Sequence, residues 1–96
     1  MSAQKDFIAK MLGELQYAEE KHNGFPTDRI HASAILAEEA GKLTQACIDY
    51  TYGNFPIEAD ENYRDTVLVE RMEKFAARVG AMALRFYNSL PAMEGE

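Results

Sequence analysis

Hydrophobic residues in this chain recur every three or four positions within three long segments, which is the spacing of amphipathic α-helices. Two short stretches that combine glycine and proline, 24–27 and 53–56, separate these segments. Glycine and proline end helices and form turns, so the pattern predicts an all-α fold of three long helices in a single domain. The predicted helices cover residues 2–23, 28–52 and 60–89, and the domain covers residues 1–96.

The ends of the predicted helices follow from residues with known capping preferences. Thr27 or Asp28 suits the N-cap of the second helix, because its side-chain oxygen can accept a backbone N–H. Pro91 cannot continue a helix, so the third helix is expected to end by Ser89. Residues 92–96 are then expected to fray.

The third segment has two faces that both suit helix packing. Its large apolar residues recur at alternating steps of four and three, which is a heptad seam. The seam is Leu68, Met72, Phe75, Val79, Met82 and Phe86, and beside it lie the small residues Ala76, Ala77, Gly80, Ala81 and Ala83. Three helices in 96 residues do not cover both faces, so we expect a homo-oligomeric helical bundle. Cover by loops and the first helix within a monomer is the alternative.

Composition and charge narrow the classes of function. The formal net charge of −6 argues against a nucleic-acid polymer as the main partner, because such proteins carry a basic face. Cys47 is the single cysteine, so no internal disulfide forms, and its place on the apolar stripe of the second helix predicts a small buried residue. No apolar run reaches membrane-spanning length, and the first residues lack the apolar core of a signal peptide. We therefore expect a cytoplasmic protein without a membrane partner.

Four glutamates are candidate metal ligands. Glu39 lies on the apolar stripe of the second helix and Glu38 lies at its edge, whereas Glu70 and Glu73 share a face of the third helix. If the second helix packs in the small-residue groove near Gly80, these carboxylates converge. Converging carboxylates repel one another unless a cation lies between them, and Mg²⁺ is the hard cation that carboxylates hold.

The same residues also fit an ordinary helix surface. Glu38 and Lys42 form an i, i+4 pair of favourable orientation, and Glu70 and Lys74 form another. Such pairs are common on solvated helices and contribute a few tenths of a kcal/mol.

Several basic residues are candidates for phosphate binding. Arginines recur every seven residues on the third helix, at Arg71, Arg78 and Arg85, and add cations that a phosphate could use. A solvated helix flank is the alternative for this row. Tyr50, Tyr52, Phe55 and Tyr63 gather around the second break, where they either stack on a base or cap the end of the bundle.

Residues 31–49 and 79–86 resemble the MazG-like, all-α nucleoside triphosphate pyrophosphohydrolase superfamily. Its motifs are Glu-Glu-x-x-Glu on one helix and Glu-x-x-Asp on a later one. Glu38 and Glu39 match the first two acids, but Lys42 stands where the third acid belongs. Glu70 and Glu73 give Glu-x-x-Glu in place of Glu-x-x-Asp. A lysine donates hydrogen bonds and cannot coordinate Mg²⁺, so the metal site is depleted.

The resemblance implies a homodimer or tetramer that binds a nucleotide with Mg²⁺ and hydrolyses a nucleoside triphosphate to the monophosphate and pyrophosphate. The resemblance assigns Glu38, Glu39, Glu70 and Glu73 to the metal. Lys42, with Arg78, becomes a phosphate ligand instead, and hydrolysis is expected to be weakened or lost. No catalytic residue can be named from the sequence. The alternative function is a non-catalytic helical oligomer that serves as a structural or interaction protein.

Overall fold

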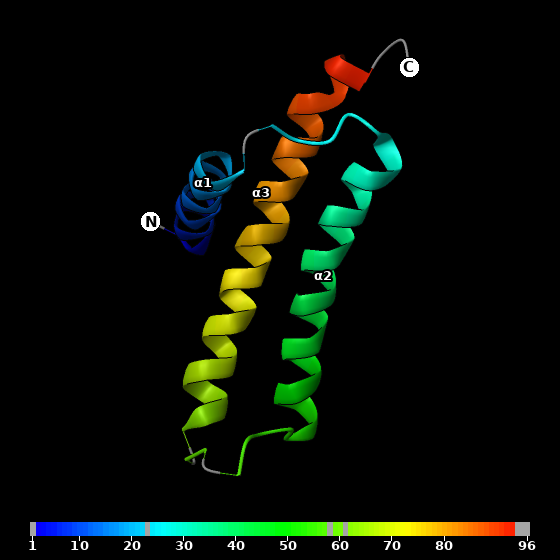
Figure 1. The fold of residues 1–96 in the computed structure, drawn as a ribbon. Helices are drawn as coiled ribbons and strands as arrows, with labels where there is room; N and C mark the ends of the chain where they lie inside the picture. Colours follow the sequence, from blue (N-terminus) through cyan, green and yellow to red (C-terminus); the bar gives the residue numbers. More distant parts are fainter. Residues whose placement is uncertain (1, 23, 58, 61, 94–96) are drawn as a thin grey trace.

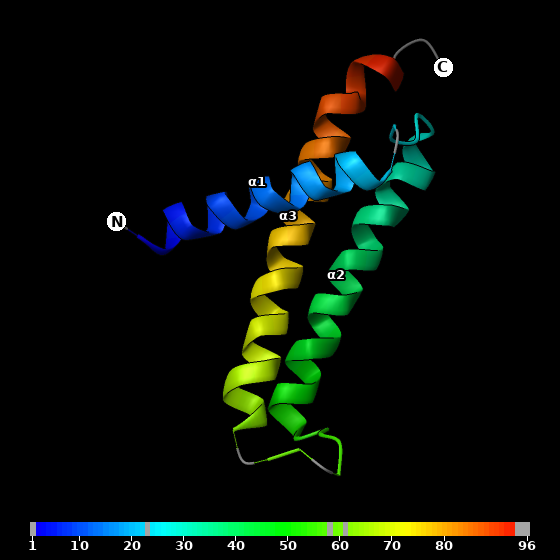
Figure 2. The same ribbon diagram turned by 60° about the vertical axis from the view of Figure 1, so that its left-hand side comes forward.

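A computed structural model of the chain describes residues 2–22, 24–57, 59–60 and 62–93, and helices make up its regular structure (Figure 1). The elements are α1 (Ala3–Lys21), α2 (Arg29–Tyr52), a π-helical turn η1 (Arg64–Leu68) and α3 (Val69–Met93). Helices α2 and α3 run side by side in opposite directions, and α1 crosses α3 (Figures 1 and 2). The described part holds no strand, so the predicted all-α fold with three packed helices is confirmed.

The starts of the first two helices are fixed by side-chain caps. The Ser2 Oγ accepts a hydrogen bond from the Lys5 backbone N–H at 3.2 Å, and Asp28 Oδ2 accepts one from His31 N–H at 2.9 Å. These bonds satisfy N–H groups that have no partner within the helix. Helix α2 ends at Gly53, which has a φ of 69° and occupies the left-handed conformation that glycine adopts at helix ends.

The third helix begins later than the sequence predicts. The Asp60 side chain accepts a hydrogen bond from Asn62 N–H at 2.9 Å, and the Asp60 carbonyl accepts one from Tyr63 N–H at 3.1 Å. These bonds hold a turn in place of the predicted first helical residues. The backbone then passes through the π-helical turn before α3 starts at Val69.

The third helix also ends later than predicted, and the expected stop at Ser89 is wrong. Pro91 lies inside α3, which continues to Met93. Proline removes one backbone hydrogen bond, but near a helix end this loss is small against the burial of a large side chain. Met93 is fully buried, and its carbonyl accepts a hydrogen bond from Arg29 Nη2 at 3.0 Å. Of the residues expected to fray, 92 and 93 are helical, and 94–96 lie outside the described residues.

Helix α1 occupies the small-residue groove of α3. A Cβ built on Gly80 would lie 2.6 Å from Met11 Sδ and 3.4 Å from Phe7 Cζ, so any larger residue at position 80 would displace side chains of α1. Ala18 joins Ala81 and Met82 in the main core cluster. Helix α3 therefore contacts both α1 and α2, and Ile35 and Leu36 of α2 pack against the same cluster. None of the described helices is long and apolar enough to cross a membrane.

Candidate functional site

A broad pocket lies between α1 and α2, and α3 forms its floor. Its volume is about 530 Å³, and four residues that the sequence predicts for the site line it together: Glu38, Glu39, Lys42 and Arg78. Glu14, Tyr17, His22 and His31 add further polar groups. The structure thus brings the first two motif acids and both predicted phosphate ligands into one place.

Glu39 lines this pocket and is already paired with cations. Lys42 Nζ lies 3.4 Å from its Oε2, and Arg78 Nη1 lies 4.0 Å from its Oε1. The Glu39 side chain is only 13% exposed. Its Oε1 is buried and has no hydrogen-bond partner among the described residues. Lys42 therefore pairs with Glu39, three residues before it, and not in the expected i, i+4 geometry with Glu38.

Arg78 links the pocket to the first helix. Its Nε donates a hydrogen bond to Glu14 Oε1 at 3.2 Å, and its guanidinium also lies 5.8 Å from the centre of the Phe75 ring. Arg78 is thus shared between a carboxylate on α1 and Glu39 on α2. The sequence analysis missed Glu14, because a contact between residues 64 positions apart leaves no local signal.

The acids of α3 lie elsewhere. Glu70 and Glu73 line a second pocket of about 360 Å³ with Lys10 and Lys74, and Lys10 Nζ lies 3.7 Å from Glu73 Oε1. They face α1 there, because the pocket is lined by residues of α1 and α3. The single chain therefore does not gather the four predicted metal ligands into one site.

The donor set of one chain does not fit a bound Mg²⁺ ion. Magnesium needs several free oxygen ligands in octahedral geometry. Among the described residues, no three His, Cys, Asp or Glu side chains lie close enough together to hold a metal ion. Two cations already occupy the neighbourhood of Glu39, and they would repel a third.

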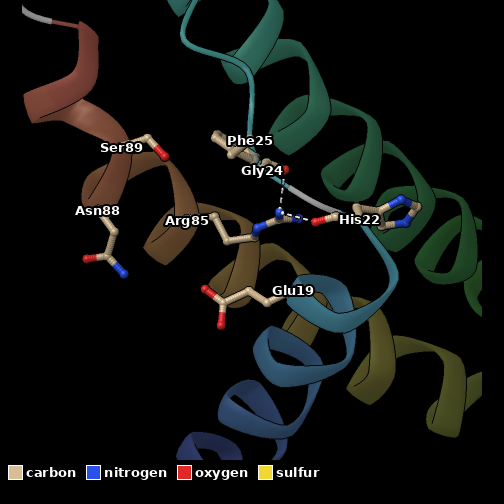
Figure 3. A pocket seen from close by; sticks show the side chains of 7 residues that line it. All are labelled: Glu19, His22, Gly24, Phe25, Arg85, Asn88 and Ser89. Atoms are coloured by element: carbon tan, nitrogen blue, oxygen red, sulfur yellow. Dashed lines mark hydrogen bonds between the residues drawn. The ribbon is translucent and has the colours of Figure 1, made fainter.

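The arginine row is not a uniform solvated flank, and this interpretation is wrong for Arg85. Arg71 is exposed and Arg78 is half-buried, but Arg85 is only 7% exposed. Its Nη2 donates hydrogen bonds to the carbonyls of Gly24 at 2.9 Å and His22 at 3.3 Å (Figure 3). These carbonyls follow the C-terminal end of α1, where a positive charge is favourable.

Phe25 completes the surroundings of Arg85. The guanidinium carbon lies 4.9 Å from the centre of the Phe25 ring, within the range of a cation–π interaction. Arg85 and Phe25 line a small pocket of about 300 Å³ together with Glu19, Asn88 and Ser89 (Figure 3). Arg85 thus holds the end of α1 and the following loop against α3, so the third arginine of the row has a structural role.

The predicted burial of Cys47 is also wrong, because its side chain is exposed. Leu36, Ala40 and Leu43 on the same stripe are likewise only half-buried.

The aromatic residues around the second break cap the end of the hairpin. The Phe55 and Tyr63 rings lie 5.6 Å apart, and Arg64 lies 5.1 Å from the Tyr50 ring and 5.5 Å from the Phe55 ring. Tyr52 is 76% exposed. This group lies at the α2–α3 connection, at the opposite end of the hairpin from the α1–α2 connection (Figure 1). The aromatic residue that does line the main pocket is Tyr17.

None of the protein-family models, curated proteins or solved structures compared with the chain matches it. The MazG-like resemblance therefore stays a prediction that rests on the residues of this sequence.

Proposed function

We propose that the chain is a divergent MazG-like domain that acts as a homo-oligomer and has little or no nucleotide pyrophosphohydrolase activity. The observation that carries this proposal is that the carboxylate of Glu39 lies beside two cationic side chains. The second acid of the motif is paired with Lys42 at 3.4 Å and approached by Arg78 at 4.0 Å. Cations of the protein thus take the place that a metal ion would have in an active site.

A pocket of this kind is expected to hydrolyse a nucleotide slowly, because the reaction depends on metal ions. Pyrophosphate release from a nucleotide needs metal ions that bridge phosphate oxygens and activate water. Lys42 removes one ligand and adds a positive charge, so it weakens metal binding in two ways. Lys42 and Arg78 can still attract a phosphate. The carboxylates of Glu14, Glu38 and Glu39 repel a phosphate that carries no metal ion.

The shape of the chain supports the oligomer. Its radius of gyration is 15.7 Å, whereas a compact domain of this length has a value of about 12.5 Å. Large apolar side chains are exposed on the first helix, where Phe7, Ile8 and Leu12 are 38%, 39% and 48% exposed. The same observations favour the second candidate function, a helical oligomer that serves only as a structural or interaction protein.

Substitution of Lys42 by glutamate tests the proposed ancestry of the pocket. Lys42→Glu restores the third motif acid, so we expect it to make the protein more stable in millimolar Mg²⁺, by about 1 kcal/mol in the free energy of unfolding. The measurement is thermal unfolding with and without Mg²⁺, together with pyrophosphate release from a panel of ribo- and deoxyribonucleoside triphosphates. The wild-type chain is expected to show neither the Mg²⁺ effect nor turnover.

Lys5→Glu is the matched control, because Lys5 is an exposed lysine that lines neither this pocket nor the pocket of Glu70 and Glu73. It should respond to Mg²⁺ no more than the wild type does. Rapid turnover by the wild type would overturn the proposed loss of activity. If Lys42→Glu gained no Mg²⁺ response, the pocket would not be a remnant metal site, and the purely structural function would be favoured.

A further inference from the structure

The connection between α2 and α3 is a surface loop with hydrogen-bonded turns of its own. It lies at one end of the hairpin, opposite the α1–α2 connection (Figure 1). Surface loops that are held by their own contacts are frequently functional. Three backbone hydrogen bonds close successive turns of this loop, and they join the N–H groups of Phe55, Ala59 and Tyr63 to the carbonyls of Gly53, Pro56 and Asp60 at 3.0, 3.0 and 3.1 Å, respectively.

An aromatic cluster attaches this loop to the ends of both helices. The Arg64 guanidinium carbon lies 5.1 Å from the centre of the Tyr50 ring and 5.5 Å from that of the Phe55 ring. The Phe55 and Tyr63 rings are 5.6 Å apart. The turns and the cluster together give the loop a defined conformation, so a partner that binds it would lose little free energy in ordering it.

Large apolar side chains of this region project into solvent. Ile57 is fully exposed and directly follows Pro56, so it lies at the apex of the turn that Ala59 N–H closes. Tyr52, in the last turn of α2, is 76% exposed, and Phe55 is also partly exposed. We call this surface the hairpin tip, and it consists of Tyr52, Phe55 and Ile57. Exposed apolar side chains that gather on one ordered surface are typical of a protein-binding site.

Most of the net negative charge of the chain lies around the hairpin tip. Residues 49–65 contain five acidic residues and one basic residue, so they carry a net charge of −4 out of −6 for the whole chain. This charge disfavours a nucleic acid or an anionic membrane as the partner, and it also repels the hairpin tip of a second copy. A cationic protein surface is the partner that the charge selects. The acids are Asp49, Glu58, Asp60, Glu61 and Asp65, and the base is Arg64.

We propose that the hairpin tip docks a basic protein segment with an apolar anchor, of the kind that an amphipathic helix rich in lysine presents. Apolar side chains of the partner would cover Ile57 and Tyr52. Its cations would lie near the exposed carboxylates of Asp60 and Asp65. An apolar centre with a charged rim is the usual arrangement of a protein interface. The proposal does not use the pocket of Glu39, so it goes beyond the proposed function and is tested separately from it.

Binding of three synthetic peptides tests the apolar and the charged part of the surface separately. The first is a fluorescein-labelled peptide of leucine and lysine in which the leucines form one face of a helix. The second replaces its lysines by glutamates, and the third replaces its leucines by serines. Fluorescence anisotropy with the wild-type chain should show that the leucine–lysine peptide binds about tenfold more tightly than either of the others. Its affinity should fall as the salt concentration rises.

Substitution of Ile57 tests the apolar part in the protein itself. Ile57→Ser removes the anchor without disturbing packed side chains, because Ile57 is fully exposed, and it should weaken binding of the leucine–lysine peptide about tenfold. Ile30→Ser is the matched control, because Ile30 is 79% exposed and lies at the start of α2, at the opposite end of the hairpin (Figure 1). It should bind the peptide as the wild type does. Far-UV circular dichroism verifies that both variants keep their helices.

Substitution of Asp60 tests the charged part. Asp60→Asn removes one negative charge but keeps a side-chain oxygen that can accept the Asn62 N–H, and it should weaken peptide binding about twofold at low salt. Asp28→Asn is the matched control, because it removes the same charge from the cap of α2 and also keeps the capping oxygen. It should leave peptide binding unchanged.

Several outcomes would overturn the docking surface. One is that the wild type does not bind the leucine–lysine peptide even at millimolar concentration, and another is that Ile57→Ser and Ile30→Ser bind it equally. Equal binding of the serine–lysine peptide would show an attraction of charge alone, without the apolar anchor. If Ile57→Ser, but not Ile30→Ser, dissociated a wild-type oligomer in sedimentation, the hairpin tip would be a contact between copies and not a site for a basic partner. These measurements use neither Mg²⁺ nor a nucleotide, so a failure of this proposal is distinguished from a failure of the proposed function.

Discussion

The two helix contacts of α3 are built in different ways. Within the hairpin, the buried residues of α2 are the alanines Ala32 and Ala46, which let the two helices approach closely along their length. The contact with α1 combines the close approach at Gly80 and the apolar cluster of Ala18, Ala81 and Met82 with several polar contacts. Its polar contacts are Lys10 with Glu73, Glu14 with Arg78, and Arg85 with the carbonyls of His22 and Gly24.

This difference explains why residues predicted to bind a ligand have structural roles instead. Glu73 and Arg78 are predicted to bind a metal ion and a phosphate, respectively. In the structure both form ion pairs with α1. A charged residue beside a small-residue groove can serve the ligand or the neighbouring helix, and the choice depends on which helix enters the groove.

The largest expected effect on the α1 contact comes from Arg85. Arg85→Ala removes two hydrogen bonds from a buried charged group to carbonyls and a cation–π contact, so it should destabilise the protein by about 3 kcal/mol. For a chain of this size, the melting temperature should fall by roughly 15 °C. Thermal unfolding followed by circular dichroism measures the change.

Arg71→Ala is the control for this prediction, because Arg71 lies in the same row and is exposed. Its effect should stay within about 0.5 kcal/mol. Equal losses of stability at the two positions would contradict the view that Arg85 is a buried structural residue and Arg71 a solvated one.

The hairpin could be predicted from the sequence because its signals are local. Apolar residues at helical spacing locate both helices, Asp28 marks the start of α2, and glycine and proline mark the turn between them. The end of α3 could not be predicted in this way. Helix propensity places a stop near Pro91, but the full burial of Met93 and the hydrogen bond from Arg29 are tertiary contacts that outweigh it.

The site is predictable only in part for the same reason. Glu38, Glu39 and Lys42 share one helical turn, so their common location follows from helix geometry alone. Their meeting with Arg78 depends on how α2 and α3 pack, and the separation of Glu70 and Glu73 from them depends on α1. Periodicity identifies the faces of a helix but does not say which helix covers each face. The Mg²⁺ and nucleotide assignments stay predictions.

The next largest effect is expected at the close approach of α1. Gly80→Leu places a side chain where Met11 Sδ lies, so α1 must move away, at a net cost of about 1–2 kcal/mol. Gly41→Leu is the same change on α2, where a Cβ meets nothing within 4 Å. It should stabilise the protein by about 0.8 kcal/mol, because leucine favours a helix more than glycine does.

Hydrogen exchange shows whether the damage is confined to α1. In Gly80→Leu the amides of α1 should exchange faster while the central amides of α2 remain protected. Uniform loss of protection in both helices would contradict the view that α1 is attached to a hairpin that holds together separately.

The smallest expected effect distinguishes the two ion pairs that join α1 to α3. Glu14 and Arg78 are about three-quarters buried and hydrogen-bonded, so a double-mutant cycle with Glu14→Ala and Arg78→Ala should give a coupling energy of about 1 kcal/mol. Lys10 and Glu73 are each 54% exposed at 3.7 Å, so the same cycle should give less than about 0.3 kcal/mol. Urea unfolding of the wild type and the six variants measures both values. A larger coupling for Lys10 and Glu73 would mean that the exposed end of α1 is held more tightly than its packing indicates.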